Sequence, residues 1–395
     1  MVRSPHVRAC GERPRFESGV TGAPKTVLGA AKIKLRVAGA AQAQKENSSR
    51  SAAASIRFPR LWLREARVLI STHILGTGAY APKRILTNQD LENMVATTDA
   101  WISERTGIKE RRIAAEGEVT SDMAVIAARH ALAMAGCKAE DLDMILVATI
   151  SADMPLPSCA VIVQAKLGAT RAFAFDLSAA CAGSLFGLSI ADQFIRTGKA
   201  KRILVIGAEL LSRLVDWTDR NTCVLFGDAA GAMVVGPTSD PGRGLISTHL
   251  HSDGTAAGIL SIPGGGSRHP QSEDVLARNM HKITMNGREI YKFAVRVLPQ
   301  AILEALDANG LKVGDIDHIV SHQANARIVE SVLERLDIPL EKCWLNLDRY
   351  GNTSSASLPI SLDEANRAGR LKKGDLIAMM AIGAGMAWGS ALMRW

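Results

Sequence analysis

Cys181 lies in a short segment whose residue types and order could make its thiol a nucleophile. The segment FAFDLSAACAGSLFGL (173–188) passes from an apolar, strand-type start through small residues to leucines at helical spacing, which places the cysteine near a strand-to-helix turn. Unpaired amides and the positive end of the helix dipole favour a thiolate there without a neighbouring cation. Free cysteine is also among the most buried residue types, so taken alone, close packing of a helix on a sheet is the simpler interpretation.

Two more polar residues follow predicted strands in the second half of the chain. His322 in IVSHQAN comes after Ile319 and Val320 and before a predicted helix, and Asn352 in YGNTSSAS follows a predicted strand that ends near Leu347. The carboxyl ends of strands form the crevice where chemistry is done in doubly wound sheets. A satisfied interior histidine and a turn-forming asparagine are the structural alternatives. Together with Cys181, these two positions predict one shared site.

Trp101 and Arg105 are spaced i to i+4 in the stretch 87–108, which we predict as two short helices with a break near Thr97. An indole and a guanidinium on one helix face can hold a flat heterocycle between them. A half-buried tryptophan beside a salt-bridged arginine explains the pair equally well.

The elements that must position these residues alternate between strand and helix. We predict strands at 68–82, 144–150, 173–177, 202–209, 317–323 and 343–348, a strand, bend and strand at 222–237, a closing strand pair at 376–393, and helices at 120–136, 159–168, after Cys181, and at 289–310, 326–336 and 353–369. Because the strands are almost continuously apolar, we expect an α/β fold with a mostly parallel sheet covered on both faces. Residues 244–287 are predicted as an irregular connection, and the recurring order strand, turn, helix at 176–185 and 348–358 weakly suggests a duplicated unit.

The positive charge of the chain is concentrated at its start. The net charge is +8, but residues 1–67 contain fourteen basic residues and four glutamates, so the remaining 328 residues are slightly acidic and give no indication of a nucleic-acid partner. We interpret 1–67 as an organellar transit peptide, a disordered arm or sequence upstream of a misassigned start, with Val68 as a candidate start, and we favour the last two. Residues 376–393 lack charge over eighteen positions, but three glycines interrupt them, so we predict core strands and no membrane span.

The six cysteines are scattered through the chain without a CxxC pair. This distribution is typical of reduced thiols in the cytoplasm and indicates neither a disulfide framework nor a zinc site.

Residues 68–395 resemble β-ketoacyl-acyl-carrier-protein synthase III of the thiolase superfamily. The resemblance rests on six motifs in the family's order: TDAWISERTGIKERRI, AACAGSLFGL, TDRNTCVLFGDAAGA, SHQANARI, YGNTSSASLP and GMAWGSALMRW. It implies a thiolase-like αβαβα fold made of two similar halves, 68–243 and 244–395, and a homodimer. It also implies an acyltransferase that condenses acetyl-CoA or another short acyl-CoA with malonyl-acyl-carrier protein. No cofactor or metal is implied, since acyl-CoA is a substrate, and the expected location is the cytoplasm, or a plastid if 1–67 is a transit peptide.

The resemblance also implies roles for individual residues. Cys181 is the expected nucleophile, and the backbone amides of Cys181 and Ala384 are the expected oxyanion hole, although the family generally has glycine at the latter position. His322 and Asn352 are expected to donate hydrogen bonds to the malonyl thioester carbonyl, which requires a neutral histidine.

Further positions match the family's substrate contacts. The expected CoA-binding residues are Thr97, Trp101, Arg105, Arg220 and Asn325, and the expected carrier-protein contacts are Lys292, Arg296, Arg327 and Arg335. A solvated charge distribution explains the last four about as well, and Glu334 replaces one basic position of the family.

Two departures from the family concern the acyl pocket. Leu156 and Ile382 stand where many members have aromatic residues, which predicts room for a primer longer or more branched than acetyl. The loop at 262–280 is longer than in compact members, and its role is open. A starter synthase or acyltransferase of secondary metabolism, and a binding protein on the same fold, are the alternative functions; the presence of Cys181, His322 and Asn352 favours condensation.

Overall fold

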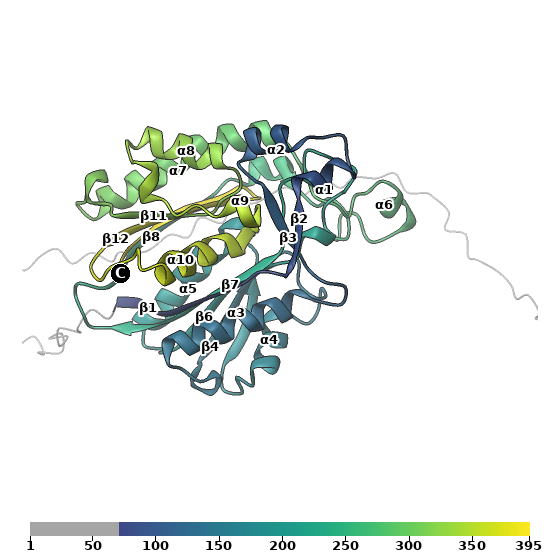
Figure 1. Ribbon diagram of the computed structural model, residues 1–395. Coiled ribbons are helices and arrows are strands. Elements are labelled where there is room, and N and C mark those ends of the chain that lie inside the picture. Colours follow the sequence, from purple (N-terminus) through teal and green to yellow (C-terminus); the bar gives the residue numbers. More distant parts are fainter. Residues whose placement is uncertain (1–70) are drawn as a thin grey trace, which may run out of the picture. The chain divides into compact units, whose positions relative to one another are not determined.

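Two β-sheets alternate with three layers of helices in residues 71–395, the part of the chain that the computed structural model describes (Figure 1). The extension predicted at 1–67 and the predicted start of the first strand at Val68 lie outside the described residues.

The first sheet has five strands in the order β1-β7-β6-β4-β5. Their bounds are β1 Ser71–Tyr80, β4 Met144–Ala148, β5 Phe173–Leu177, β6 Ile203–Glu209 and β7 Ala229–Thr238. Strands β4, β5 and β6 are parallel to one another, whereas β7 is antiparallel to both β6 and β1.

The second sheet has four strands in the order β11-β12-β13-β8. Their bounds are β8 Gly244–Ser252, β11 His318–Ser321, β12 Leu376–Gly383 and β13 Ala387–Arg394. Only β11 and β12 are parallel, and the other two pairs are antiparallel. The prediction of one mostly parallel sheet was therefore wrong, because an uninterrupted apolar run indicates burial on both faces and not the direction of the neighbouring strand.

Helices cover both faces of each sheet. Helices α3 (Thr120–Ala135) and α4 (Cys159–Leu167) lie on the outer face of the first sheet, α5 (Gly183–Arg196) and α10 (Ser357–Arg367) lie between the sheets, and α7 (Gly287–Ala308) and α8 (Ala326–Arg335) lie on the outer face of the second sheet (Figure 1). This is the five-layered αβαβα arrangement that the resemblance implied. The strands of the first sheet all precede residue 243 and those of the second follow it.

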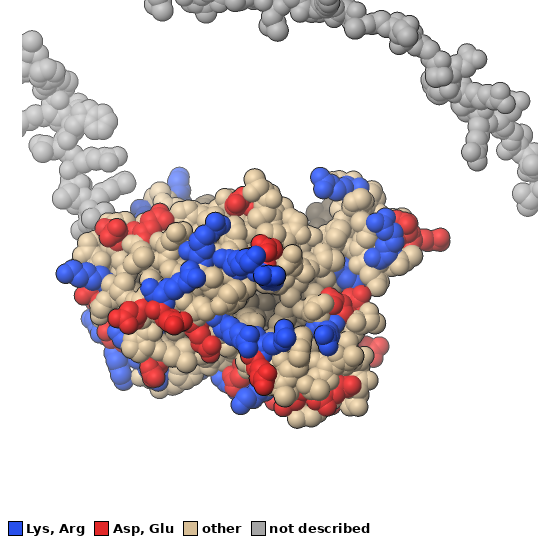
Figure 2. Space-filling view, turned by 90° about the horizontal axis from the view of Figure 1, so that it is seen from above, with Lys and Arg blue, Asp and Glu red and all other residues tan. Residues whose placement is uncertain are grey.

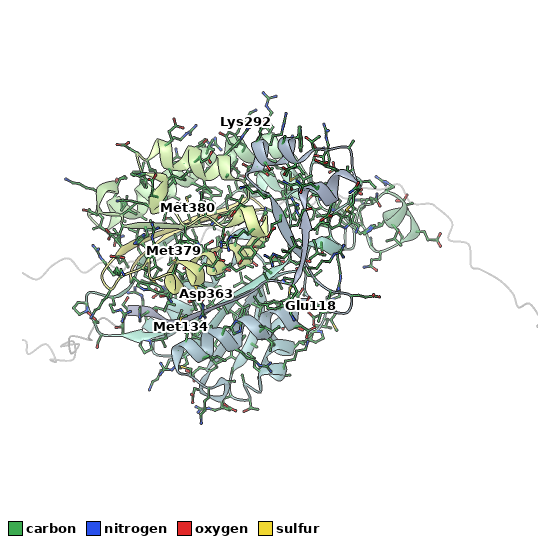
Figure 3. The ribbon with its side chains drawn as sticks, viewed as in Figure 1. Glu118, Met134, Lys292, Asp363, Met379 and Met380 are labelled. Atoms are coloured by element: carbon green, nitrogen blue, oxygen red, sulfur yellow. The ribbon has the colours of Figure 1, made fainter. Side chains whose placement is uncertain are left out.

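Three hydrophobic clusters hold the layers together, one for each helical layer. The middle cluster joins Leu185 and Leu188 of α5 to Met379 of β12, while the neighbouring Met380 belongs to the cluster under α7 and α8. Figure 3 labels these two methionines on β12, where alternate side chains face opposite sides of the sheet. The charge-free stretch 376–393 thus forms two buried strands, as predicted, and no helix within residues 71–395 is long and apolar enough to span a membrane.

Short helices and two small strand pairs lie outside the two main sheets. They are α1 Asn88–Glu92, α2 Asp99–Thr106, α6 Glu273–Ala277, α9 Leu347–Tyr350, and the two-stranded pairs of β2 Arg84–Thr87 with β3 Glu110–Ile113 and of β9 Leu260–Ser261 with β10 Thr284–Met285. Two of them match the predicted pair of short helices at 87–108.

Three local predictions differ from the structure. Residues 244–252 form β8 and are not irregular, because they pair with β13 along its free edge. Residues 222–225 form turns and not a strand, and Phe226 makes only an isolated bridge to Asn352. Residues 343–348 make only an isolated bridge from Cys343 to Ile319 before α9 begins, because the side-chain Oε1 of Gln323 accepts the backbone N–H groups of Asn346 and Leu347 at 2.9 and 3.1 Å and turns the chain.

Candidate active site

Cys181 lies at the junction between β5 and α5, as the sequence predicted. β5 ends at Leu177, a 3-10 turn covers Ala180–Ala182, and α5 begins at Gly183. Ala180, directly before the cysteine, has a φ of 46°, a left-handed conformation that is unusual for a residue with a Cβ and that concentrates at functional sites. The turn therefore places Cys181 just before α5, where it lines a cavity.

The thiol of Cys181 is uncharged near neutral pH. Burial raises its pKa to about 12, and the nearby carboxylate of Glu209 acts in the same direction, while a hydrogen bond from Ser354 opposes them. The predicted stabilisation of a thiolate by the helix start is therefore contradicted for the free chain, because desolvation of the charged form outweighs it.

His322 follows β11 directly and is also buried. Burial lowers the pKa of His322 to about 4, so the ring is neutral at pH 7. Its Nδ1 lies 2.6 Å from the hydroxyl oxygen of Ser357 at the start of α10. The neutral histidine expected from the sequence is therefore present.

Asn352 is held by the backbone on both sides of its side chain. Its N–H donates to Leu225 O at 2.8 Å, and its carbonyl accepts from Gly227 N at 3.0 Å. Its side-chain Oδ1 accepts the backbone N–H of Ser354 at 2.9 Å, so Nδ2 is the atom left to donate elsewhere. Asn352 follows α9 and not a strand, which corrects the predicted position. It still lines the same cavity as Cys181, and the next turn, Ser354–Ala356, packs against β6 and β7.

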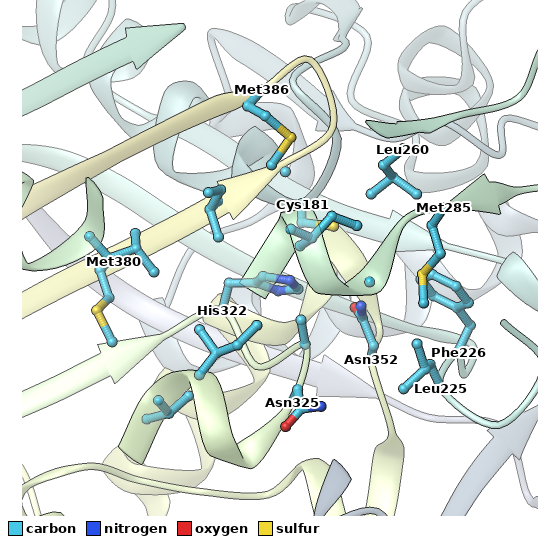
Figure 4. A pocket seen from close by; sticks show the side chains of 18 residues that line it. Cys181, Leu225, Phe226, Leu260, Met285, His322, Asn325, Asn352, Met380 and Met386 are labelled. Atoms are coloured by element: carbon cyan, nitrogen blue, oxygen red, sulfur yellow. The ribbon is translucent and has the colours of Figure 1, made fainter. Parts of the chain in front are cut away.

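One cavity, called the reactive cavity below, is lined by all three proposed reactive residues (Figure 4). Figure 4 shows Cys181, His322 and Asn352 approaching the same space from three separate segments. Most other lining residues are apolar, among them Phe226, Leu260, Met285, Ile290, Leu298, Ile328, Val329, Met380, Ile382 and Met386. The arrangement can present a thiol and two neutral polar groups to a substrate with little water present.

The turn between β12 and β13 passes unusually close to Cys181. A Cβ on Gly383 would lie 2.5 Å from the backbone nitrogen of Cys181 and 3.0 Å from Ala179 O, so only glycine permits this approach. Ala384, the predicted second oxyanion-hole residue, follows directly and is half-buried.

A second pocket, the outer pocket, adjoins the reactive cavity. It contains Trp101 and Arg105, the pair predicted to hold a flat heterocycle. Trp101, Arg105, Asn221 and Arg327 line it, and it shares Leu225, Met285, Gly287 and Asn325 with the reactive cavity. The guanidinium groups of Arg105 and Arg220 lie 4.8 and 4.9 Å from the centre of the Trp101 ring. Both cations therefore lie against the indole ring.

The remaining two predicted CoA residues differ in their positions. Asn325 caps α8 through its Oδ1, which accepts from Arg327 N at 2.9 Å, and its Nδ2 donates to Arg105 O at 2.9 Å, so it joins α8 to α2 where the two pockets meet. Thr97 is half-buried next to Ala96, whose carbonyl accepts from Arg220 at 3.0 Å, and it lines neither pocket.

The four predicted carrier-protein contacts lie on α7 and α8. Figure 2 shows Lys and Arg side chains gathered around a hollow on this face, and Figure 3 shows Lys292 pointing outward. Lys292 is paired with Glu289 at 2.8 Å, Arg296 lies over the ring of Phe293, and Arg335 donates to Val295 O at 2.6 Å. Arg327 lines the outer pocket, so it is the one most directly placed at the entrance.

The two predicted acyl-pocket residues lie in different places. Ile382 lines the reactive cavity, whereas Leu156 is 85% exposed in the single chain. A third pocket also borders Cys181 and is lined by apolar residues including Ile150, Leu211, Phe226, Ile262 and Ile283.

Three polar residues of the site were not singled out from the sequence. Ser354 and Ser357 lie in the motif YGNTSSASLP, where the run of small hydroxyl residues was the available signal. Glu209 ends β6 inside an apolar strand, is fully buried, and accepts from Ser354 Oγ at 3.0 Å and from Ile150 N at 3.1 Å. Burial raises the pKa of Glu209. Its carboxyl group ties the 3-10 turn Ser354–Ala356 of one half to the first sheet of the other.

The comparisons with known proteins agree with this site. Residues 175–254 match the model of 3-oxoacyl-[acyl-carrier-protein] synthase III, and residues 306–395 match the model of its C-terminal part. The chain is 53% identical over 326 residues to the β-ketoacyl-[acyl-carrier-protein] synthase III of Caldanaerobacter subterraneus subsp. tengcongensis, covering 82% of this chain and 98% of the relative.

Solved structures give the same result. The 3-oxoacyl-[acyl-carrier-protein] synthase III from Aquifex aeolicus VF5 aligns with a TM-score of 0.76 at 47% identity, over 82% of this chain and all of that one. The priming β-ketosynthase from the R1128 polyketide biosynthetic pathway aligns with a TM-score of 0.75 at 36% identity, over 82% of this chain and 96% of that one. On this evidence the chain belongs to the 3-oxoacyl-[acyl-carrier-protein] synthase III family.

Proposed function

We propose that the chain catalyses the decarboxylative condensation of acetyl-CoA, or another short acyl-CoA, with malonyl-acyl-carrier protein, the step that initiates type II fatty acid biosynthesis. The observation that carries this proposal is the convergence of Cys181, His322 and Asn352 on one apolar cavity in a member of this family.

In the first half-reaction, Sγ of Cys181 attacks the thioester carbonyl of acyl-CoA. The new C–S bond replaces the bond to CoA, and the thiol proton ends on the sulfur of the released CoA. The backbone amides of Cys181 and Ala384 are the proposed donors to the oxyanion, and the close passage of Gly383 beside Cys181 supports their pairing.

In the second half-reaction, malonyl-acyl-carrier protein loses CO2 and the electron pair of the broken C–C bond moves into an enolate. His322 and Asn352 donate to its oxygen, and the enolate carbon then attacks the acyl group and releases the Cys181 thiolate, which takes up a proton. Neutral donors fixed in a dry cavity stabilise the enolate more than the starting carbonyl. The orientation of the Asn352 amide, set by Ser354 N–H, supports its role as a donor.

The outer pocket is the proposed site for the CoA nucleotide. Trp101, Arg105 and Arg220 offer an aromatic face and cations for an adenine and its phosphates, and Asn325 stands where this pocket joins the reactive cavity. Thr97 is a proposed peripheral contact of CoA. The basic face of α7 and α8, with Lys292, Arg296, Arg327 and Arg335, is the proposed docking surface for the acidic carrier protein (Figure 2).

The third pocket is the proposed site of the primer chain, because Cys181 lines it and most of its other lining residues are apolar. We infer that the chain acts as a homodimer and that Leu156 contributes to the partner's pocket. Among the described strands, the edge strand β5 pairs with β4 alone and exposes Phe173 and Phe175. Leu156, in the segment before α4, is 85% exposed. An unpaired apolar edge of this kind calls for a partner. The absence of an aromatic side chain at Leu156 supports acceptance of primers longer or more branched than acetyl.

A starter synthase of a secondary-metabolite pathway is the alternative. The observation that favours it is the likeness to the R1128 priming β-ketosynthase at 36% identity, which is lower than the 53% and 47% identity to the two synthase III relatives reported above.

The two half-reactions can be tested separately. We expect wild-type protein to gain one acyl group in intact-mass measurements with acetyl-CoA and to release CO2 from malonyl-acyl-carrier protein. Cys181→Ser should lose acylation, whereas Asn352→Ala should retain acylation and release CO2 roughly 100-fold more slowly, the usual effect of losing one oxyanion donor. Normal decarboxylation by Asn352→Ala would show that the assigned role is wrong. Repeating the acylation with a panel of acyl-CoA primers separates the short-primer function from the alternative.

A further inference from the structure

Ser357 is a buried hydroxyl residue that contacts the His322 ring but does not line the cavity itself. It is the first residue of α10 and is 3% exposed. Its Oγ lies 2.6 Å from Nδ1 of His322 and 2.9 Å from the carbonyl oxygen of Ser354, and it also receives a long contact from Gln323 N at 3.5 Å. The hydroxyl therefore stands between a ring nitrogen and a carbonyl oxygen.

A count of hydrogens separates two arrangements. The hydroxyl has one hydrogen, which it can donate either to the Ser354 carbonyl or to an unprotonated Nδ1. The Ser354 carbonyl already accepts the backbone N–H of Ser357, so it keeps a partner when the hydroxyl turns to the ring. The contact to Nδ1 is the shorter of the two.

The choice decides which nitrogen of the neutral ring carries the proton. If the hydroxyl donates to Nδ1, the single ring proton lies on Nε2, and Nε2 donates into the cavity. If Nδ1 carries the proton instead, Nε2 presents a lone pair to the cavity and repels an enolate oxygen.

We propose that Ser357 is a positioning residue that holds the proton of neutral His322 on Nε2 and so makes His322 a donor in the malonyl half-reaction. The inference rests on the proposed function and extends it by a residue outside the reactive cavity. No proton leaves the site in this role, because the hydroxyl only selects between two neutral forms of the same ring.

When the Ser357 hydroxyl is removed, Nδ1 of His322 loses its proposed hydrogen-bond donor, and a carbonyl acceptor remains nearby. The Ser354 carbonyl, which lies 2.9 Å from Ser357 Oγ, is the acceptor that remains beside the ring, and its backbone hydrogen bond acts to raise the pKa of His322. In Ser357→Ala, this carbonyl favours a proton on Nδ1, and Nε2 becomes an acceptor. Acylation of Cys181 does not use the Nε2 donor, so the two half-reactions respond differently.

The test compares Ser357→Ala with Ser361→Ala. Ser361 lies one turn further along α10, is equally buried, and bonds to Gln323 and Asn346 rather than to His322. We expect Ser357→Ala to acylate from acetyl-CoA at close to the wild-type rate and to release CO2 from malonyl-acyl-carrier protein roughly 100-fold more slowly. Ser361→Ala should change both rates by the same factor, and Ser357→Thr, which retains the hydroxyl, should recover decarboxylation.

The outcomes are distinct. Equal losses of both half-reactions in Ser357→Ala, or no loss of either, would overturn the role of Ser357 while leaving the proposed function in place. If wild-type protein itself fails to decarboxylate malonyl-acyl-carrier protein, the proposed function fails instead.

A direct measurement covers the case in which Ser357→Ala does not fold. Nitrogen-15 NMR of histidine-labelled wild-type acyl-enzyme distinguishes the two neutral tautomers, and the His322→Asn spectrum assigns the signal among the nine histidines of the chain. A protonated Nε2 and a bare Nδ1 are expected at His322. A protonated Nδ1 would refute the inference.

Discussion

Burial keeps the two titratable groups of the reactive cavity uncharged. The pKa of Cys181 is raised to about 12 and that of His322 is lowered to about 4, each chiefly by the loss of water around its charged form. A neutral histidine suits enolate stabilisation, since its N–H can donate without a fixed positive charge. The neutral thiol means that acylation includes removal of a proton and is not the attack of a preformed thiolate.

Alkylation of Cys181 tests its protonation state. Only the thiolate reacts, so a thiol with a pKa of about 12 should react slowly with iodoacetamide at neutral pH, and the rate should rise about tenfold per pH unit from about pH 7 to about pH 9. Peptide mass spectrometry gives the rate at this position, and Cys181→Ser shows the background. A plateau in the rate below pH 8 would contradict the raised pKa.

At the scale of elements, the last residue of β12 brings the second half of the chain next to Cys181. The strand is buried along its whole length, so its end has little freedom to move away from Cys181. The contact is made by Gly383, which leaves room only for a hydrogen atom.

A methyl group at position 383 should therefore disturb the site. Gly383→Ala places a Cβ 2.5 Å from the backbone nitrogen of Cys181, which costs roughly 1–3 kcal/mol and displaces the proposed oxyanion donors. We expect slower acylation from acetyl-CoA in intact-mass time courses. Gly314→Ala is the control, since no atom lies within 4 Å of its added Cβ. Equal acylation rates in both variants would rule out this arrangement of the turn.

The strand predicted at 343–348 shows why some elements could not be read from the sequence. Its apolar alternation satisfies the pattern for a strand, but Gln323, some twenty residues earlier, supplies the acceptor that diverts the chain into α9. β8 shows the reverse, because its polar residues form a strand once the edge of β13 is available. Both outcomes depend on partners distant in sequence, which local periodicity does not contain.

At the scale of the whole molecule, the exposed edge of the first sheet is the observation behind the proposed homodimer. Phe173 and Phe175 are 47% and 37% exposed on β5, the outermost strand. An edge strand in a single chain has unpaired backbone N–H and C=O groups, which can pair with a strand of another chain.

A charge on this edge should separate the proposed dimer. Phe175→Arg places a guanidinium where a partner strand would pack, and analytical ultracentrifugation should show half the wild-type mass. Leu340→Arg changes an exposed apolar residue outside this edge and should leave the mass unchanged. A monomeric wild-type protein, or a Phe175→Arg variant of wild-type mass, would contradict the proposal.

The sequence by itself determined the order of most strands and helices, the position of Cys181 at a strand-to-helix turn, and the choice of the three proposed reactive residues, because these depend on local periodicity and on motifs. Only the tertiary structure decided strand direction, the protonation of Cys181 and His322, and the hydroxyl and carboxyl groups of Ser357 and Glu209 that hold the site. The physical reason is that burial and hydrogen-bond partners come from segments distant along the chain, and they exist only once the layers have packed together.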